Sequence, residues 1–267
     1  LYVSPNVVAF RARKTAPTGG QGLFVVGNYQ GRLSARGETL RLLDAAGREA
    51  GTVSYPASPS PVQQFLRISE IMYHPLPPPE GSPFVDEDFE FVRLKNIGPA
   101  DLDLTGVAFT AGINYSFTGS SVTSLAAGDS VYLVRNVSAF TARYGRGFNI
   151  AGPYAGRLDN NGEKLRLEDA SGESVLEFSY NNSWYPSTAG AGFSLVITDE
   201  KAPWTVWDDK ANWRPGQLAN GSPASGSPAL KAWKASHFTA PELALVAVSG
   251  DDADPDHDGQ SNIGEFL

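Results

Sequence analysis

The strongest chemical signal in the sequence is an acidic stretch near its carboxyl end. Residues 254–265 read DPDHDGQSNIGE, which fits the pattern D-x-D-x-D-G-x5-E over all twelve positions. Oxygen ligands at this spacing suit calcium, because a hard divalent cation relieves the repulsion between crowded carboxylates. The expected metal ligands are Asp254, Asp256, Asp258, the backbone carbonyl of Gln260, Asn262 (often through water) and both carboxylate oxygens of Glu265. Gly259 permits the sharp turn that such a loop makes.

Ser261 stands where paired loops of this kind carry an aliphatic residue, which favours a single loop over a paired sensor. The alternative interpretation is a solvated acidic segment, since only Phe266 and Leu267 follow the pattern.

Three other groups of residues could carry chemistry, and each has a plainer structural interpretation. The acids at 86–88 together with Glu90 could form a surface cation site, but a solvated loop before a strand is favoured. Residues 159–162 (DNNG) have ligand chemistry, yet they stand where a turn is needed. Five aromatic residues within thirty positions could stack on sugar faces or, as we favour, pack against the domain: Trp184, Tyr185, Trp204, Trp207 and Trp213.

The composition excludes several classes of function. The chain has no cysteine, which removes disulfide scaffolds, thiolate catalysis and cysteine-based zinc sites. Its three histidines are far apart, and we expect His74 to bond within a loop, His237 to pack on a helix and His257 to be a non-ligand. A net charge of −8 disfavours nucleic-acid and anionic-membrane binding. No phosphate loop, nucleophile elbow or metalloprotease motif occurs.

The elements that position these residues are predicted to be mainly short strands. Glycine and proline together are about 18% of the chain, above the usual ~12%, which suits strands joined by turns. The strands expected in the main domain are 66–73, 89–95, 102–109, 113–117, 130–134, 163–168, 174–180 and 193–198. We expect helices over 137–144 and 229–238, and one that begins at the Thr239–Glu242 capping box and runs to about Val248.

The core predicted from strand periodicity and the family pattern given below comprises Ile68, Ile71, Phe91 or Val92, Leu94, Val107, Tyr132, Phe140, Leu165, Leu167 and Phe178.

An internal repeat relates the two ends of the strand-rich region. Residues 2–13 match 132–143 at seven of twelve positions, and residues 29–49 match 154–174 at twelve of twenty-one. The second copy has about sixty residues before its matching block, and the first has none. The chain is therefore predicted to hold one full repeat and the rear half of another.

Four strand and turn motifs recur in the main domain: EFVRLKN at 90–96, LDLTG at 102–106, LAAG at 125–128 and the hairpin from Gly156 to Asp169. Together they resemble the motifs of the lamin tail domain, with Arg93 in place of the usual glutamate. The resemblance covers 65–220 fully and 1–56 as a rear half. It implies an immunoglobulin-like antiparallel β-sandwich without catalytic residues, of a variety found in large secreted bacterial proteins. The carboxyl-terminal loop resembles half of a dockerin, more loosely.

The predicted organisation is a rear half-repeat at 1–62, a complete sandwich at 63–218, a Gly/Ser/Pro linker at 219–229, and short helices with the calcium loop at 230–267. We read the chain as part of a longer, secreted or cell-surface bacterial protein. The leading hypothesis is a non-enzymatic structural, adhesion or assembly module whose partners are other domains or chains of a surface assembly, with no membrane insertion. The alternative is a glycan-binding accessory module of an exported hydrolase.

The half-repeat raises a further expectation. Its apolar positions, at Leu23, Val25, Leu40, Leu42 and Val53, would have no cover of their own. The proline-rich segment 56–64 favours an end-to-end arrangement, so we expect residues outside this chain to complete it.

Overall fold

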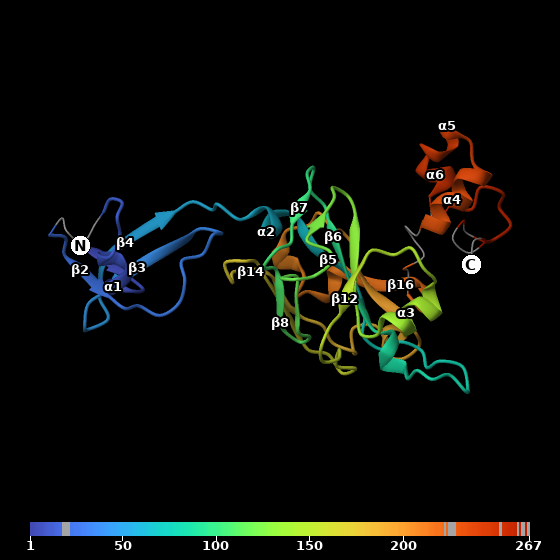
Figure 1. Ribbon diagram of the computed structural model, residues 1–267, viewed down its shortest axis with the longest axis horizontal. Coiled ribbons are helices and arrows are strands. Elements are labelled where there is room, and N and C mark those ends of the chain that lie inside the picture. Colours follow the sequence, from blue (N-terminus) through green and yellow to red (C-terminus); the bar gives the residue numbers. More distant parts are fainter. Residues whose placement is uncertain are drawn as a thin grey trace. The chain divides into compact units, whose positions relative to one another are not determined.

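The computed structural model describes residues 1–17, 22–221, 223, 228–250, 253–260, 262 and 265, without the side chains of 228–231 and 246. The chain divides into two units, Leu1–Pro59 and Ser60–Leu267, labelled by element in Figure 1. The second unit therefore contains both the strand-rich region and the carboxyl-terminal helices.

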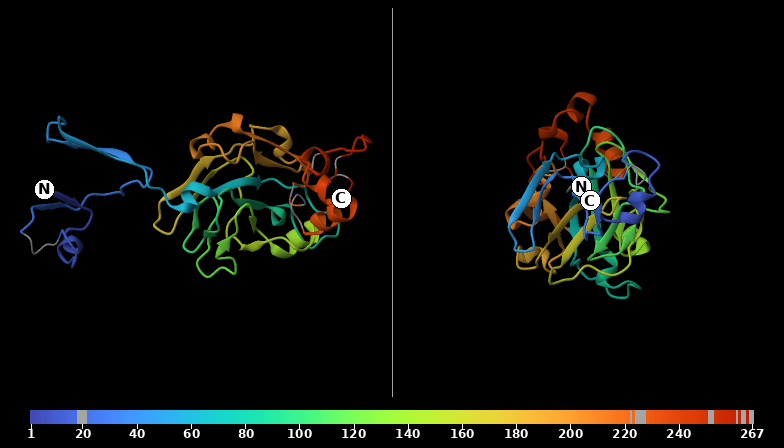
Figure 2. Two further views of the ribbon diagram at one scale, coloured as in Figure 1. Left: turned by 90° about the horizontal axis from the view of Figure 1, so that it is seen from above. Right: turned by 90° about the vertical axis from the view of Figure 1, so that its left-hand side faces the viewer.

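The second unit is a β-sandwich of a six-stranded and a four-stranded sheet, with a further strand pair at one side (Figure 2). The six-stranded sheet has the order β12-β11-β6-β5-β15-β16 and the four-stranded sheet the order β14-β13-β8-β9, while β10 pairs with β7. The first sheet comprises β5 (Leu66–Met72), β6 (Phe91–Asn96), β11 (Ser130–Val134), β12 (Ile150–Pro153), β15 (Phe193–Ile197) and β16 (Trp213–Ala219). The others are β7 (Leu102–Asp103), β8 (Ala108–Ala111), β9 (Tyr115–Ser116), β10 (Ser124–Leu125), β13 (Lys164–Glu168) and β14 (Ser174–Ser179).

The immunoglobulin-like β-sandwich predicted from the sequence is confirmed, with one departure from antiparallel pairing. Strand β12 runs parallel to β11, because the helix α3 (Val137–Tyr144) connects them and returns the chain to its starting end. The sequence predicted neither β12 nor β16. The segment 102–109, expected as one strand, is β7 and β8 separated by a turn at Leu104–Gly106.

The core lies between the two large sheets and is apolar. Every residue of the predicted core is buried, and Leu165 and Leu167 are fully inaccessible. A smaller aromatic cluster packs α3 onto the six-stranded sheet and consists of Met72, Phe91, Tyr132, Val134 and Phe140.

The start of the second unit is a short helix, α2 (Pro61–Phe65), inside a segment that the sequence predicted to be linker. Ser60 accepts a hydrogen bond from the Gln63 backbone, and the Gln63 side chain accepts one from the Ser60 backbone. Val62 is buried, and Gln63 donates to the carbonyl of Ser174 on β14. These contacts attach the segment to the sandwich.

Three helices and four short 3₁₀ turns, one of them at Asp86–Phe89, complete the described part of the second unit. The helix expected from Thr239 to Val248 is two pieces, α5 (Ala240–Leu243) and α6 (Val246–Ser249), after α4 (Pro228–His237). The capping box at Thr239 is present, but the chain leaves the helical hydrogen-bonding pattern at Ala244. The 3₁₀ turns at the sandwich margin are Pro186–Thr188, Trp204–Val206 and Lys210–Asn212. No helix in the described part of the chain is long and apolar enough to cross a membrane.

The first unit contains two strand pairs and one helix. Strands β1 (Tyr2–Ser4) and β2 (Val25–Gly27) run parallel, connected through α1 (Val7–Arg11), while β3 (Glu38–Leu43) and β4 (Glu49–Tyr55) form an antiparallel hairpin.

These elements match β11, α3, β12 and the β13–β14 hairpin in detail. Tyr2 pairs with Val25 as Tyr132 pairs with Ile150, and both hairpins break register at the same place. The Tyr55 hydroxyl donates to the Ser34 carbonyl and Glu38. Tyr180, 125 positions later, donates to Asp159 and Glu163 in the same way.

Candidate functional site

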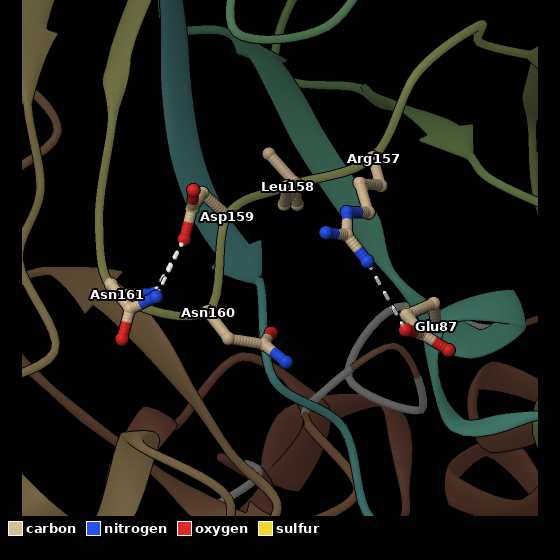
Figure 3. Close-up of a pocket in the computed structure, with 6 residues that line it drawn as sticks. All are labelled: Glu87, Arg157, Leu158, Asp159, Asn160 and Asn161. Carbon is tan, nitrogen blue, oxygen red and sulfur yellow. Dashed lines mark hydrogen bonds and ion pairs between the residues drawn. The ribbon is translucent and has the colours of Figure 1, made fainter.

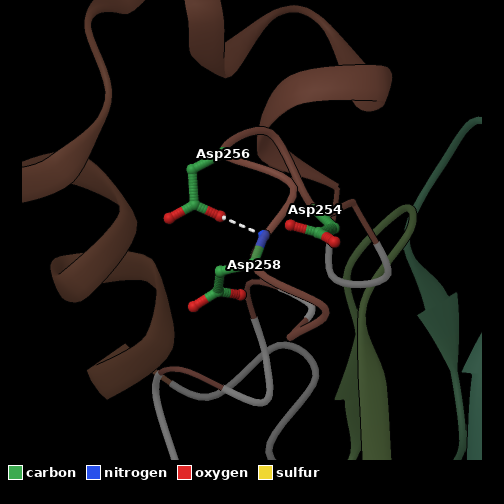
Figure 4. Close-up of side chains that lie close together, drawn as sticks. All are labelled: Asp254, Asp256 and Asp258. Carbon is green, nitrogen blue, oxygen red and sulfur yellow. Dashed lines mark hydrogen bonds between the residues drawn. The ribbon is translucent and has the colours of Figure 1, made fainter.

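Three aspartates of the carboxyl-terminal acidic loop lie together. Asp254, Asp256 and Asp258 each offer a carboxylate oxygen, and these atoms all lie within 4.8 Å of one another (Figure 4). Asp256 accepts from the backbone N–H of Asp258 at 3.3 Å, and Asp254 accepts from that of Gly259 at 3.1 Å. Gly259 has φ +93°, a conformation that a side chain would disfavour. The loop thus converges carboxylate oxygens at one point.

The surroundings of this loop contain two buried oxygen atoms without hydrogen-bond partners among the described residues. They are Oδ1 of Asp254 and Oδ1 of Asn262, and the Asn262 residue is completely buried. The Asn262 amide is held in one orientation, because its Nδ2 donates to the carbonyls of Val248 and Gly250 at 2.8 and 2.7 Å. Such oxygens normally have a partner, so the donor set fits a hard cation such as calcium.

Two other predicted ligands, Gln260 and Glu265, do not belong to the aspartate cluster. Gln260 is exposed, and its backbone N–H donates to Asp258 at 2.8 Å. Glu265 is exposed and does not belong to the group of three clustered carboxylates found among the described residues. Coordination by Glu265 would therefore require its side chain to move toward the aspartates.

A second acidic group, predicted to be a solvated loop, is only partly solvated. Residues Asp86–Phe89 form a 3₁₀ turn, but Glu90 is completely buried at the start of β6. One Glu90 oxygen accepts from the Tyr154 hydroxyl at 2.8 Å and from the Leu158 backbone at 2.9 Å. The other oxygen is buried without a partner in the described structure. Burial raises the pKa of Glu90 to about 7, against these hydrogen bonds, which lower it.

A small pocket of about 200 Å³ is lined in part by Leu158, whose backbone N–H donates to Glu90 (Figure 3). Arg157 reaches across it toward Glu87 at 3.6 Å, and Asn161 donates to Asp159 at 3.2 Å on the opposite wall. Its lining is Glu87, Arg157, Leu158, Asp159, Asn160 and Asn161. The polar groups are largely engaged with one another or with the turn, as the turn interpretation of 159–162 predicts.

The aromatic group packs mainly into the sandwich. Trp207 and Trp213 are buried, and their indole N–H groups donate to the carbonyls of Ile68 and Trp207 at 3.0 and 2.8 Å. Trp184 packs against the core at its edge, whereas Trp204 is 39% exposed. Few ring faces of this group are thus available for stacking on sugars.

The histidines occupy structural positions. His237 stacks on Trp233, with ring centroids 4.3 Å apart. His74 lies against Gly190, but its buried Nδ1 has no hydrogen-bond partner among the described residues, so the hydrogen bond expected within its loop is not observed at this atom. His257 is within the acidic loop and is exposed.

The first unit carries the largest set of exposed apolar side chains in the described structure. The β3–β4 hairpin exposes Leu40, Leu42 and Val53 on one face, while the equivalent Leu165, Leu167 and Phe178 are buried. Tyr55, in contrast, is partly covered and bonded to its own hairpin. The β3–β4 hairpin therefore has the same local structure as β13–β14 without the burial of its apolar face.

Comparison with known proteins connects the sandwich to one family. Residues 59–182 match the family model of the Lamin Tail Domain, an immunoglobulin-like and non-catalytic family. The matched segment runs from α2 to just past the end of β14. Strands β15 and β16, which lie beyond it in the sequence, complete the six-stranded sheet. No curated protein and no solved structure matched the chain.

Proposed function

We propose that this chain is a non-enzymatic structural and assembly segment of a secreted or cell-surface multidomain protein, with a calcium-stabilised element at its carboxyl end. The lamin tail match supports a structural or protein-interaction role for the sandwich. The observation that carries the assembly role is the uncovered apolar face of β3–β4, which monomeric proteins rarely expose.

The tandem-repeat interpretation underlies this proposal. Two segments with matching sequence also share strand register, helix caps and tyrosine hydrogen bonds. The cap of α1 is the Asn6 side chain accepting from Ala9, and that of α3 is Asn136 accepting from Ala139. A first copy with so many contacts equivalent to those of the second is best explained as a rear half that a further segment covers.

The calcium element is supported by the aspartate cluster together with the buried oxygens of Asp254 and Asn262. Asp254, Asp256 and Asp258 would bind the ion directly, with Asn262 and Glu265 closing the coordination. Calcium here would have a structural role, because it removes carboxylate repulsion in a segment with a small core.

The calcium proposal is tested by isothermal titration calorimetry of the full chain. We expect one binding site, with affinity reduced at least about tenfold in Asp254→Ala and in Glu265→Ala. The matched control is Asp129→Ala, which removes an exposed carboxylate outside the loop. The absence of any calcium heat in the parent chain would refute this part of the proposal.

The assembly proposal is tested with an apolar dye such as ANS, which reports exposed hydrophobic surface. The chain should bind the dye, and Leu42→Asp should reduce the signal because Leu42 is central to the exposed face. Thr39→Asp, on the opposite face of β3, should leave it unchanged. Equal dye binding by all three proteins would contradict the proposal.

A further inference from the structure

We infer that the first unit binds a segment, outside these 267 residues, of the same kind as residues 60–130 of this chain: one strand of it adds to the open edge of β1 and another to the open edge of β3. The inference rests on the assembly role proposed above and specifies the partner.

The first contact is defined by the neighbours of β11. In the second unit β11 lies between β12 and β6, and Leu133 pairs with Val92 in the antiparallel ladder with β6. Its counterpart β1 pairs with β2 alone among the described residues. A β6-like strand would therefore add antiparallel to β1, with a Val92 equivalent opposite Val3.

The second contact is defined by the neighbours of β13. That strand lies between β14 and β8, and Leu167 pairs with Phe109 of β8. Its counterpart β3 pairs with β4 alone in the described structure. An incoming β8-like strand would place an aromatic residue opposite Leu42.

The side chains left uncovered match what such a segment would bury. Leu42 is 53% exposed and Val53 59%, whereas Leu167 and Phe178, their equivalents, are at most 1% exposed. A second match involves aromatic rings. The ring centroids of Tyr2 and Phe10 lie 5.4 Å apart, and those of their equivalents Tyr132 and Phe140 lie 5.6 Å apart.

In the second unit a ring from β6 completes this aromatic cluster. The ring centroid of Phe91 lies 5.8 Å from that of Phe140 and 5.8 Å from that of Tyr132. The partner must therefore carry an aromatic residue at the position of Phe91. It must also carry apolar residues at the positions of Val92 and Phe109, on two strands that add to β1 and β3 at the same time. Main-chain addition of this kind gives affinity, and the alternating side chains give register.

A second copy of this chain does not meet these requirements. Its first unit would offer another rear half, which also lacks the β6 and β8 equivalents. Its own β6 and β8 are already paired with β11 and β13, and Phe91, Val92 and Phe109 are buried there. Recruiting them would open an intact sandwich.

The test extends the full chain at its amino end with a copy of its own residues 60–131, joined to Tyr2, because Tyr2 is equivalent to Tyr132. Hydrogen–deuterium exchange is then compared with that of the parent chain. We expect amide exchange in β1 and β3 to slow by about tenfold or more, because new ladder hydrogen bonds protect those edges.

Two control grafts carry changes in the added copy only. Val92→Asp with Phe109→Asp should abolish the protection, while Thr110→Asp, at an exposed position of β8, should preserve it.

The outcomes separate this inference from the proposed function. Protection that is absent in the graft, or equal in all grafts, overturns the inference. A concentration-dependent dimer of the parent chain that Leu42→Asp dissociates also overturns it, in favour of a second copy, while the assembly role survives. The assembly role fails as well if the graft shows no protection and the parent chain neither dimerises nor binds the dye.

Discussion

Glu90 shows how one buried side chain can connect three segments of the sandwich. Its carboxyl group accepts hydrogen bonds from Tyr154 and from the backbone of Leu158, and its own carbonyl accepts from Arg135 N. These contacts hold the start of β6 against the segment that leads from β12 to β13. The position is therefore structural, although its pKa of about 7 makes it sensitive to pH.

The first prediction is that the free energy of unfolding falls as pH rises from about 5 to 7.5. The folded-state pKa of Glu90 lies above the ordinary glutamate value of 4.5, so the folded protein binds more protons than the unfolded chain within this window. The contribution of this group is about 1–3 kcal/mol, present at low pH and lost above pH 7. Burial also raises the pKa of Glu163, which adds a smaller slope of the same sign.

Urea denaturation at several pH values measures this effect. Glu90→Gln should flatten most of the slope, since the amide cannot ionise and its oxygen can still accept from Tyr154 and Leu158. Glu80→Gln, at an exposed position, is the control and should keep the parent profile. An unchanged slope in Glu90→Gln would show that the carboxyl group is not responsible.

At the scale of elements, the two hairpins β3–β4 and β13–β14 have the same local structure and different surroundings. In both, an aspartate at the turn accepts from two backbone N–H groups: Asp44 from Ala46 and Arg48, and Asp169 from Ser171 and Glu173. Turn chemistry and strand pairing are therefore encoded locally. The leucines of β13 are buried and those of β3 are exposed, because only β13 has β8 beside it in the described structure.

The second prediction compares equivalent leucines of these hairpins. Leu165→Ala should lower the free energy of unfolding by about 2–4 kcal/mol, because it leaves a cavity in the core. Leu40→Ala should change it by about 0.5 kcal/mol or less, since Leu40 is exposed. Chemical denaturation of both variants provides the measurement. Comparable losses would mean that the first hairpin is buried in solution.

Sequence patterns predicted elements well where the cause was local. The helix at 137–144 was placed correctly because Val137, Phe140 and Tyr144 share one face, and the apolar alternation of 164–168 identified its buried leucines. The helix from Thr239 was predicted too long, because a capping box specifies a start and not an end.

Long-range contacts were harder to predict. The burial of Glu90 depends on Tyr154, sixty-four residues later, and acidic neighbours at 86–88 suggested a solvated loop instead. Part of the candidate metal loop was visible as a motif. The buried state of Asn262 was not, because it depends on carbonyls of Val248 and Gly250.

For the whole molecule, the important question is how far a change in one part affects another. In the carboxyl-terminal part, Lys234 and Asn262 bond to carbonyls of Ser249, Val248 and Gly250, all within the same segment. Residues 220–227, rich in glycine and serine, separate α4 from β16 in the sequence, so the expected linker at 219–229 is shorter at both ends. A ligand stabilises only the part of a protein that unfolds together with its site.

The third prediction therefore concerns calcium and the sandwich. Saturating calcium should slow amide exchange at 253–260 and shift the main calorimetric melting temperature by only about 1 °C or less, compared with EDTA. Asp254→Ala should lose the calcium effect on exchange and keep the same melting temperature. A calcium-dependent rise of several degrees that Asp254→Ala removes would show that the loop and the sandwich unfold as one cooperative unit. The sandwich would then owe part of its stability to an ion bound at the far end of the chain, and the carboxyl-terminal helices would have to be treated as part of its core structure.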